Sequence, residues 1–215
     1  MSRILAVLSM ALIFHACHKS SNNLILSGYV YSPPEKKYIA NAEIKLKGQL
    51  YDNNTWNPNY NTITQVNTDA SGKYHIEHEK VKTGGLKLVA SKNGYIETEK
   101  EIDSEKLVPG EAYQVNMNIY PKAYLMIKIT NEFPANDNDQ LTVTLDLGTS
   151  ECPTCLQSGN TTYEGADVNT MILGKVYGKQ TYTVKWTTNI NGEISQHQQE
   201  VYCPQNDTGK LTITY

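Results

Sequence analysis

The chain has 215 residues, with 19 Lys and Arg against 22 Asp and Glu, which gives a formal net charge of −3 at pH 7. No block of lysine or arginine stands out, and this argues against nucleic acid as a partner. The aromatic residues are 15 Tyr, 2 Trp and 2 Phe. Tyrosine enrichment beside threonine, valine and isoleucine favours strands over helices.

The N-terminal residues predict export. Arg3 precedes an apolar run from Ile4 to Phe14, which is shorter than the roughly 20 apolar residues that span a bilayer and fits a secretory signal peptide. The following residues, Phe14-His15-Ala16-Cys17, resemble the lipobox of bacterial lipoproteins, with His15 in a slot that normally takes a small residue. The resemblance implies cleavage before Cys17 and acylation of that cysteine. A signal peptide without lipidation is the alternative.

Residues 17–23 are interpreted as a lipidated tether, because they are small and polar and show no hydrophobic periodicity. Several acyl chains make a stable membrane anchor, whereas one chain is only marginal. We therefore expect the lipid on Cys17 to anchor the protein to the bacterial outer membrane. The sequence leaves open whether the protein faces the periplasm or the cell surface.

Residues 24–120 predict a first domain of short strands. The clearest strand is Ala42-Glu43-Ile44-Lys45-Leu46-Lys47, which alternates strictly and places Ala42, Ile44 and Leu46 on one face. Similar runs cover residues 24–31, 73–77, 86–91 and 113–120, and turn signals such as Asp69-Ala70-Ser71-Gly72 separate them. About seven strands of this kind indicate a β-sandwich.

Four motifs follow one another in this first domain. They are Ser27-Gly28-Tyr29-Val30, the segment from Ile39 to Leu46, Thr68-Asp69-Ala70-Ser71-Gly72-Lys73-Tyr74, and Ser91-Lys92-Asn93-Gly94-Tyr95. Their order resembles that of carboxypeptidase regulatory-like domains. The resemblance implies a transthyretin-like (prealbumin-type) sandwich, and it implies a scaffold or binding role because such modules are mostly non-catalytic.

Residues 121–215 predict a second β-sandwich. Alternating runs cover residues 123–130, 141–147, 181–187, 200–203 and 211–215, and Asn191-Gly192 is the strongest hairpin signal in the chain. An immunoglobulin-like or fibronectin-like arrangement is our architectural expectation. The predicted protein is therefore all-β, with a signal peptide at 1–16, a tether at 17–23 and two tandem β-sandwich domains at 24–120 and 121–215.

Three cysteines remain beside Cys17. Cys152-Pro153-Thr154-Cys155 has the spacing of a redox motif, but a loop sequence follows it instead of the helix that would lower a thiol pKa. A zinc site lacks a convincing fourth ligand, since His197 is the only nearby candidate. A structural disulfide is the default in the oxidising bacterial envelope. We expect Cys203 to pair with Cys155, or else with Cys152, and the Cys152–Cys155 link is the alternative.

Two polar clusters do not predict a metal or a cofactor. In His75-Ile76-Glu77-His78-Glu79, a strand would place the two histidines on opposite faces. Asn136-Asp137-Asn138-Asp139 lacks the spacing and the terminal glutamate of an EF-hand and is interpreted as a turn. The sequence motifs of serine hydrolases, zinc proteases and phosphate-binding loops are absent. We therefore predict that the protein is not an enzyme.

Tyr51, Trp56 and Tyr60 lie in or beside an asparagine-rich segment at residues 49–62. Exposed rings among amides would suit a glycan platform, and the alternative is a hairpin tip whose tryptophan folds back onto the sandwich. The predicted function is a non-enzymatic, membrane-anchored envelope lipoprotein that acts as a binding or scaffold module for an unknown protein or glycan. The alternative is a glycan-binding accessory protein of an outer-membrane nutrient-uptake system.

Overall fold

The computed structural model describes residues 22–52, 55–149 and 151–215. Cys17 and the predicted signal peptide and tether up to residue 21 lie outside the described residues. Nearly every element is a β-strand, and the only helical element in the described part of the chain is the 3-10 turn Ser104–Lys106. None of the described helical structure is long and apolar enough to cross a membrane.

The first half of the chain forms two facing sheets. One contains β1 (Asn23–Ser32), β2 (Lys37–Tyr38), β5 (Lys73–Glu79), β9 (Ala112–Gln114) and β10 (Met117–Asn118). The other has the order β4 (Thr55–Asn67), β3 (Glu43–Asp52), β6 (Thr83–Ser91) and β8 (Thr98–Ile102). Alternate residues of these strands point inward and form one core, to which Leu26, Ile44 and Leu88 contribute fully buried side chains.

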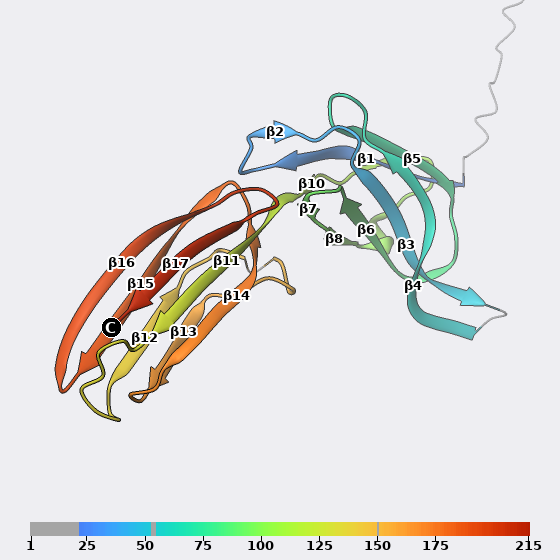
Figure 1. Ribbon diagram of the computed structural model, residues 1–215. Helices are drawn as coiled ribbons and strands as arrows, with labels where there is room; N and C mark the ends of the chain where they lie inside the picture. The colour runs from blue at the N-terminus through green and yellow to red at the C-terminus, as the bar shows by residue number, and fades with distance from the viewer. Residues whose placement is uncertain (1–21, 53–54, 150) are drawn as a thin grey trace, which may run out of the picture.

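The second half also forms two sheets. Their orders are β14 (Asn169–Tyr177), β11 (Tyr120–Thr130) and β17 (Thr208–Thr214), and β13 (Gly159–Glu164), β12 (Gln140–Leu145), β15 (Gln180–Ile190) and β16 (Glu193–Cys203). A separate core lies between them and includes Leu125, Ile127 and Leu141. Figure 1 shows the two sandwiches arranged end to end, with the C-terminus in the half farther from β1. The prediction of two tandem β-sandwich domains is confirmed.

Both sandwiches have the same strand pairing. The first strand, β1 or β11, pairs antiparallel with β5 or β14 and parallel with β9 and β10 or with β17. The facing sheets correspond as well, in the orders β4-β3-β6-β8 and β13-β12-β15-β16. Immunoglobulin domains instead place strands A, B, E and D in one sheet and C, F and G in the other. The second sandwich therefore repeats the topology of the first, which its sequence did not predict.

The predicted turns form as their residues suggest. Asn191 and Gly192, with φ angles of 50° and 87°, close the β15–β16 hairpin in the manner that a type I′ turn requires. The Asp69 carboxylate accepts hydrogen bonds from the backbone N–H groups of Ser71 and Lys73 at 2.8 and 2.9 Å. Gly72 follows with φ of 75°. The first turn fixes the register of the paired strands β15 and β16, and the second leads the chain from β4 in one sheet to β5 in the other.

Candidate functional site

The junction between the sandwiches is built around the carboxylate of Glu35, which lies in the turn between β1 and β2. This carboxylate accepts hydrogen bonds from the Lys179 ammonium at 2.6 Å and from the Tyr95 hydroxyl at 2.6 Å. It also pairs with Lys37 at 3.0 Å, and its side chain is only 3% exposed. Lys179 belongs to the second sandwich and Glu35 to the first, so the cluster joins the two domains.

Backbone contacts reinforce this junction. The short strand β7 (Tyr95–Ile96) of the first half pairs antiparallel with Tyr120 and Pro121 at the start of β11. The carbonyl of Gly94 accepts hydrogen bonds from the Lys122 backbone N–H at 2.9 Å and from the Gln205 side chain at 3.1 Å. Strands, turns and side chains from both halves of the chain therefore hold the two sandwiches together.

The charge state of Glu35 follows from these contacts. Burial opposes ionisation, but the hydrogen bonds from Lys179, Tyr95 and Lys37 outweigh it and lower the pKa of Glu35 from 4.5 to about 2. Burial and the neighbouring Glu35 carboxylate raise the pKa of Tyr95 to about 12. Because the pKa of Glu35 is lower in the folded state, its contribution to stability is present above pH 4.5 and is lost as the pH falls through about 2.

A disulfide loop covers the same junction. Cys152 and Cys155 are bonded to each other with a Cα–Cα distance of 5.3 Å, and both pack beside Ile96, Tyr120 and Tyr177. The rings of Tyr120 and Tyr177 stack with their centroids 3.9 Å apart. This small apolar cluster is separate from the cores of the two sandwiches, and it joins β7 of the first half to β11 and β14 of the second.

The predicted disulfide between Cys203 and Cys155 or Cys152 is wrong, and the alternative Cys152–Cys155 link is the one that forms. Cys203 is a free thiol, fully buried in the core of the second sandwich, whereas the other two cysteines lie in the junction cluster. Burial raises the pKa of the Cys203 thiol, which makes it less reactive. Because a turn brings Cys152 and Cys155 together, no long-range link is needed.

We expect the Cys152→Ser variant to lose at most about 2 kcal/mol of stability, since the disulfide closes a very short loop. A Cys155–Cys203 link would have contributed roughly 4 kcal/mol on the same basis. Peptide mapping without reduction should recover Cys152 bonded to Cys155, with Cys203 alkylated only after unfolding. A mapped peptide that links Cys203 to either cysteine would contradict this assignment.

The three predicted aromatic residues lie on one face of the β4-β3-β6-β8 sheet. Tyr51 and Trp56 are opposite each other in the β3–β4 hairpin, and Tyr60 is opposite Gln49. The hairpin extends almost to its tip as strands, so most of the asparagine-rich segment at residues 49–62 is paired. Trp56 and Tyr51 are 50% and 39% exposed, and Tyr60 is partly buried.

Two glycines of β6 support these rings. A Cβ atom on Gly84 would lie 2.5 Å from the indole nitrogen of Trp56, and one on Gly85 would lie 2.9 Å from the Tyr60 hydroxyl. The β3–β6 register shifts between Gly48 and Leu50, opposite these glycines, and such a bulge can direct two consecutive residues to one side. The Lys82 and Lys87 ammonium groups lie 4.8 and 4.4 Å from the ring centres of Tyr51 and Tyr60. Among the described residues, no such cation contact is found for the ring of Trp56.

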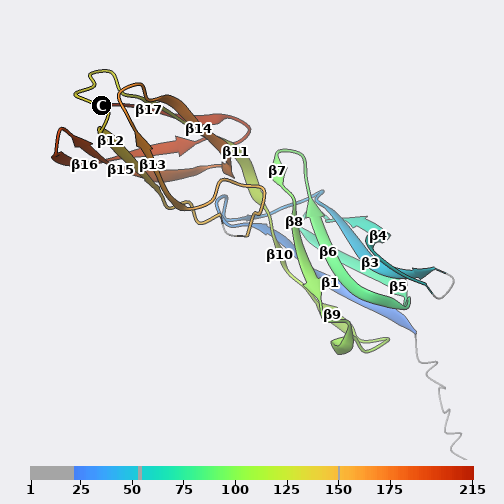
Figure 2. The same cartoon turned by 90° about the horizontal axis from the view of Figure 1, so that it is seen from below.

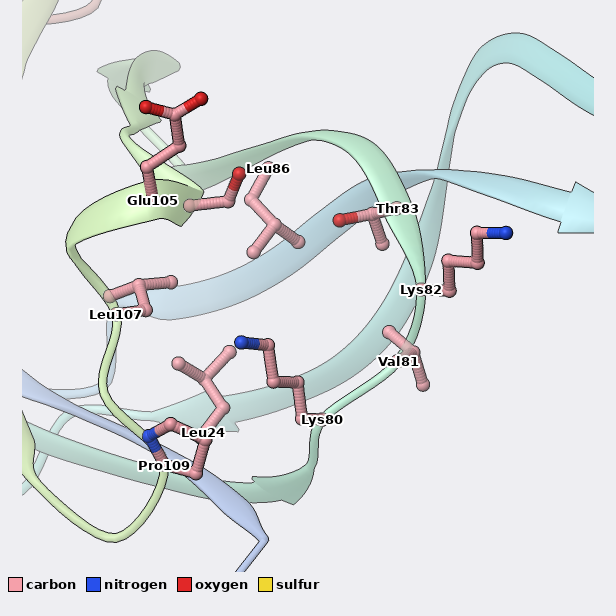
Figure 3. Close-up of a pocket in the computed structure, with 10 residues that line it drawn as sticks. Leu24, Lys80, Val81, Lys82, Thr83, Leu86, Glu105, Leu107 and Pro109 are labelled. Atoms are coloured by element: carbon pink, nitrogen blue, oxygen red, sulfur yellow. The ribbon is translucent and has the colours of Figure 1, made fainter.

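A pocket of about 240 Å³ opens at the same end of the first sandwich. Figure 3 shows the apolar side chains of Leu24, Leu86 and Leu107 around it, whereas Lys82 and Glu105 point away. Val81, Thr83, Ser104 and Pro109 complete the lining together with Lys80. The pocket therefore combines apolar surface from the leucines with the ammonium group of Lys80, which points in among them.

The other polar clusters do not form a metal centre. His75 is exposed beside the buried Ile76, and His78 lies on the opposite face of β5, where its Nδ1 contacts the Glu79 carbonyl at 2.7 Å. His197 stacks on Trp186, away from Cys203. Asp139 is buried and accepts a hydrogen bond from the Ala135 backbone at 2.7 Å, so it organises a loop. Within the described ranges, no group of three or more His, Cys, Asp or Glu side chains could hold a metal ion.

No pattern in the sequence predicted the Glu35 cluster. Glu35 stands in a polar turn with the lysines Lys36 and Lys37, a pattern that solvated turns share. Its decisive partner, Lys179, is 144 residues away in a second turn. Only the contact between the two domains gives these residues their common role.

No family model matches the chain, and no curated protein matches it. Among solved structures, the chain is similar to the Bacillus anthracis TIE protein, with 16% identity and a TM-score of 0.37 over 89% of this chain and 34% of that one. The major pilin SpaD of Corynebacterium diphtheriae has 10% identity and a TM-score of 0.33, over 83% and 65%. BcpA, the major pilin subunit of Bacillus cereus, has 11% identity and a TM-score of 0.31, over 85% and 69%.

The chain thus spans about a third of the length of the TIE protein and just under two thirds of SpaD. Similarities of this size carry no conclusion about the function of this chain.

Proposed function

We propose that the protein is a non-enzymatic lipoprotein of the bacterial outer membrane that acts as a scaffold. In this proposal Cys17 carries the lipid. The two sandwiches together act as a spacer that keeps the far end of the second sandwich away from the membrane. The observation that supports it best is the junction, where the Glu35 cluster, the β7–β11 pairing and the disulfide loop brace the two domains. A braced junction suits a spacer better than a flexible linker does.

The positions of the chain ends support the same function. β1 begins at Asn23 at the outer end of the first sandwich, and the chain ends at Tyr215 in the second. Figures 1 and 2 both show the C-terminus in the half of the molecule farthest from that outer end. A lipid on Cys17 would therefore place the first sandwich near the membrane and the second one farther out.

The junction is tested by the Glu35→Gln variant, which keeps the size of the side chain and removes its charge. Loss of the ion pairs with Lys179 and Lys37 should cost about 2 kcal/mol, below the usual loss for a fully buried pair because both lysines are partly exposed. Small-angle scattering should then show a broader range of shapes at pH 7.

Glu97→Gln is the matched control, because Glu97 is exposed beside β7 and should leave the shape unchanged. For the wild-type protein, the range of shapes seen by scattering should broaden when the pH falls from 4.5 towards 2, because Glu35 gains a proton there. The broadening should resemble that of Glu35→Gln at pH 7. The variant should show no such change over this range. A variant that scatters like the wild type at pH 7 would argue against a braced junction.

The anchor is tested separately in cells. The intact mass of the protein extracted from outer membranes should correspond to a chain that begins at an acylated Cys17, and Cys17→Ala should move the protein out of the membrane fraction. An unmodified Cys17, or a Cys17→Ala variant that stays membrane-bound, would refute the lipid anchor and leave the braced junction standing.

We also propose that the first sandwich is a carboxypeptidase regulatory-like, transthyretin-like domain. The motif residues that suggested this have defined structural tasks. Asp69 and Gly72 form the predicted turn, Gly94 has a φ of 81°, and Gly28 lies against the Val115 carbonyl.

Glycan capture for an uptake system is the second candidate, and the common face of Tyr51, Trp56 and Tyr60 favours it. The half-exposed indole of Trp56 would be the stacking surface. A glycan array followed by Trp56→Ala tests this function. Binding that the substitution abolishes would support glycan capture, and an array without any binding would exclude it for the sugars tested.

A further inference from the structure

Four segments meet at the outer end of the first sandwich, where the described chain begins. The backbone N–H groups of Lys80 and Gly110 donate to the carbonyls of Asn22 and Asn23 at 3.0 and 2.8 Å. Leu50 is opposite Thr83, so the part of the β3–β4 hairpin that leads to its tip lies here as well. We call this surface, made of residues 22–24, 80–83 and 103–111 together with Tyr51 and Trp56 of the β3–β4 hairpin, the N-terminal end.

Exposed apolar side chains gather at this end. Four large hydrophobic residues of the first sandwich are exposed among those described, and three of them, Tyr51, Trp56 and Val108, belong to the N-terminal end. The apolar pocket lined by Leu24 and Leu107 opens on the same surface. Exposed patches of this kind mark sites where a protein meets another apolar phase or a partner.

The aromatic and lysine side chains of the surface suit a lipid headgroup region, and its segment 103–111 also carries the acidic residues Asp103, Glu105 and Glu111. Tryptophan and tyrosine prefer the boundary between hydrocarbon and water, where a ring can be partly buried while its polar atom stays wet. Lys82 lies over the ring of Tyr51, Lys80 lines the pocket, and both lysines are exposed. Their stems can cover apolar surface while their ammonium groups contact lipid phosphates.

We propose that this N-terminal end rests on the lipid headgroups of the membrane, with Trp56 and Val108 at the interface. The inference depends on the proposed anchor at Cys17. Asn22 is only five residues after Cys17, and an extended chain spans at most about 3.5 Å per residue, so the tether reaches no more than about 18 Å. The anchored protein would therefore keep this surface close to the bilayer.

The two tryptophans make the contact measurable, because Trp56 lies in the first sandwich and Trp186 in the second. The mature chain with Trp186→Phe is coupled through Cys17 to a maleimide lipid in vesicles of phosphatidylethanolamine and phosphatidylglycerol. The Trp56 emission should shift to shorter wavelength, and lipids brominated near the headgroup should reduce it about twofold. In the matched Trp56→Phe variant, the emission of Trp186 should not change.

A second pair of variants separates this surface from the rest of the molecule. Val108 and Phe133 are 52% and 78% exposed, on the first and the second sandwich respectively, so charging either one should leave the fold intact. Val108→Asp should weaken the quenching of Trp56, whereas Phe133→Asp should not affect it. Thermal unfolding of each variant confirms that the fold is retained.

Emission from Trp56 that is identical in plain and brominated vesicles would overturn the proposal, because the coupling keeps the protein on the membrane. Binding of an oligosaccharide to Trp56 on the same vesicles would also overturn it, in favour of glycan capture. Since the coupling is chemical, this experiment does not depend on acylation in the cell. An unmodified Cys17 in cells would refute the anchor, and an unquenched Trp56 would refute the lipid contact alone.

Discussion

Replacing Gly28 by alanine is expected to destabilise the first sandwich by about 3 kcal/mol, because the added methyl group has no space. A Cβ atom at this position would lie 2.0 Å from the Val115 carbonyl oxygen and 2.7 Å from the carbonyl carbon. These are backbone atoms, so no side-chain rotation can relieve the clash. The parallel pairing of β1 with the segment around β9 requires this close approach.

The Val115 carbonyl cannot easily move away from Gly28. It accepts a hydrogen bond from the buried Tyr74 hydroxyl at 2.5 Å, and the Val115 N–H donates to the Ser27 carbonyl at 2.8 Å. A shift that admits an alanine would stretch both bonds and disturb the ring of Tyr74, which is 3.1 Å from the same Cβ position. The expected loss therefore combines steric strain with weakened buried hydrogen bonds.

Urea unfolding followed by Trp56 emission measures this loss, since Trp56 reports on the first sandwich. Ser27→Ala is the matched control, because it changes the neighbouring residue of β1 without adding volume, and it should cost less than about 0.5 kcal/mol. A Gly28→Ala protein as stable as this control would show that β1 and the Val115 backbone are not in close contact.

Local patterns were enough to predict some of the strands, such as β3, whereas β8, β13 and β14 were not predicted. Ala42, Ile44 and Leu46 alternate with charged residues and are all fully buried, Ile44 and Leu46 in β3 and Ala42 just before it. Asn191 and Gly192 adopt the positive φ angles that their identities favour. In both cases the residues that determine the structure are near neighbours in the sequence, so the local sequence pattern is enough to predict the strand or the turn.

Pairing between distant strands was not predictable in the same way. The parallel partners of β11 are in β17, more than 80 residues later along the chain, and alternation alone does not say which strands pair. The Cys203 prediction was wrong for a related reason. A count of loop residues cannot reveal that Cys203 is buried in one cluster and Cys152 in another.

The candidate surfaces also combine features that the sequence predicted with features that depend on contacts between distant residues. The sequence singled out Tyr51, Trp56 and Tyr60 by residue type, and the structure places them on one face. It could not predict that Gly84 and Gly85 would lie beneath the rings, because this depends on a bulge in another strand. The Glu35–Lys179 ion pair was not predictable either, because it forms only where the two domains meet.

The Ile127→Ala variant is expected to lose about 4 kcal/mol of stability in the second sandwich. Ile127 is fully buried in β11, the central strand of its sheet, with Ile172 of β14 and Leu211 of β17 as its neighbours on the two sides. Neither side can collapse into the cavity without breaking a ladder of hydrogen bonds. Ile127→Val removes only one methyl group and should cost about 1 kcal/mol.

Trp186 emission follows the unfolding of the second sandwich, and Trp56 emission follows that of the first. In Ile127→Ala the Trp186 transition should move to lower urea. The Trp56 transition should move with it if the junction couples the domains, because the first sandwich loses the contacts of Lys179 with Glu35 when the second unfolds. In the double variant Ile127→Ala with Glu35→Gln, the coupled shift of Trp56 should be smaller. A Trp56 transition that does not respond to Ile127→Ala would mean that the two sandwiches unfold independently and that the junction contributes little to stability.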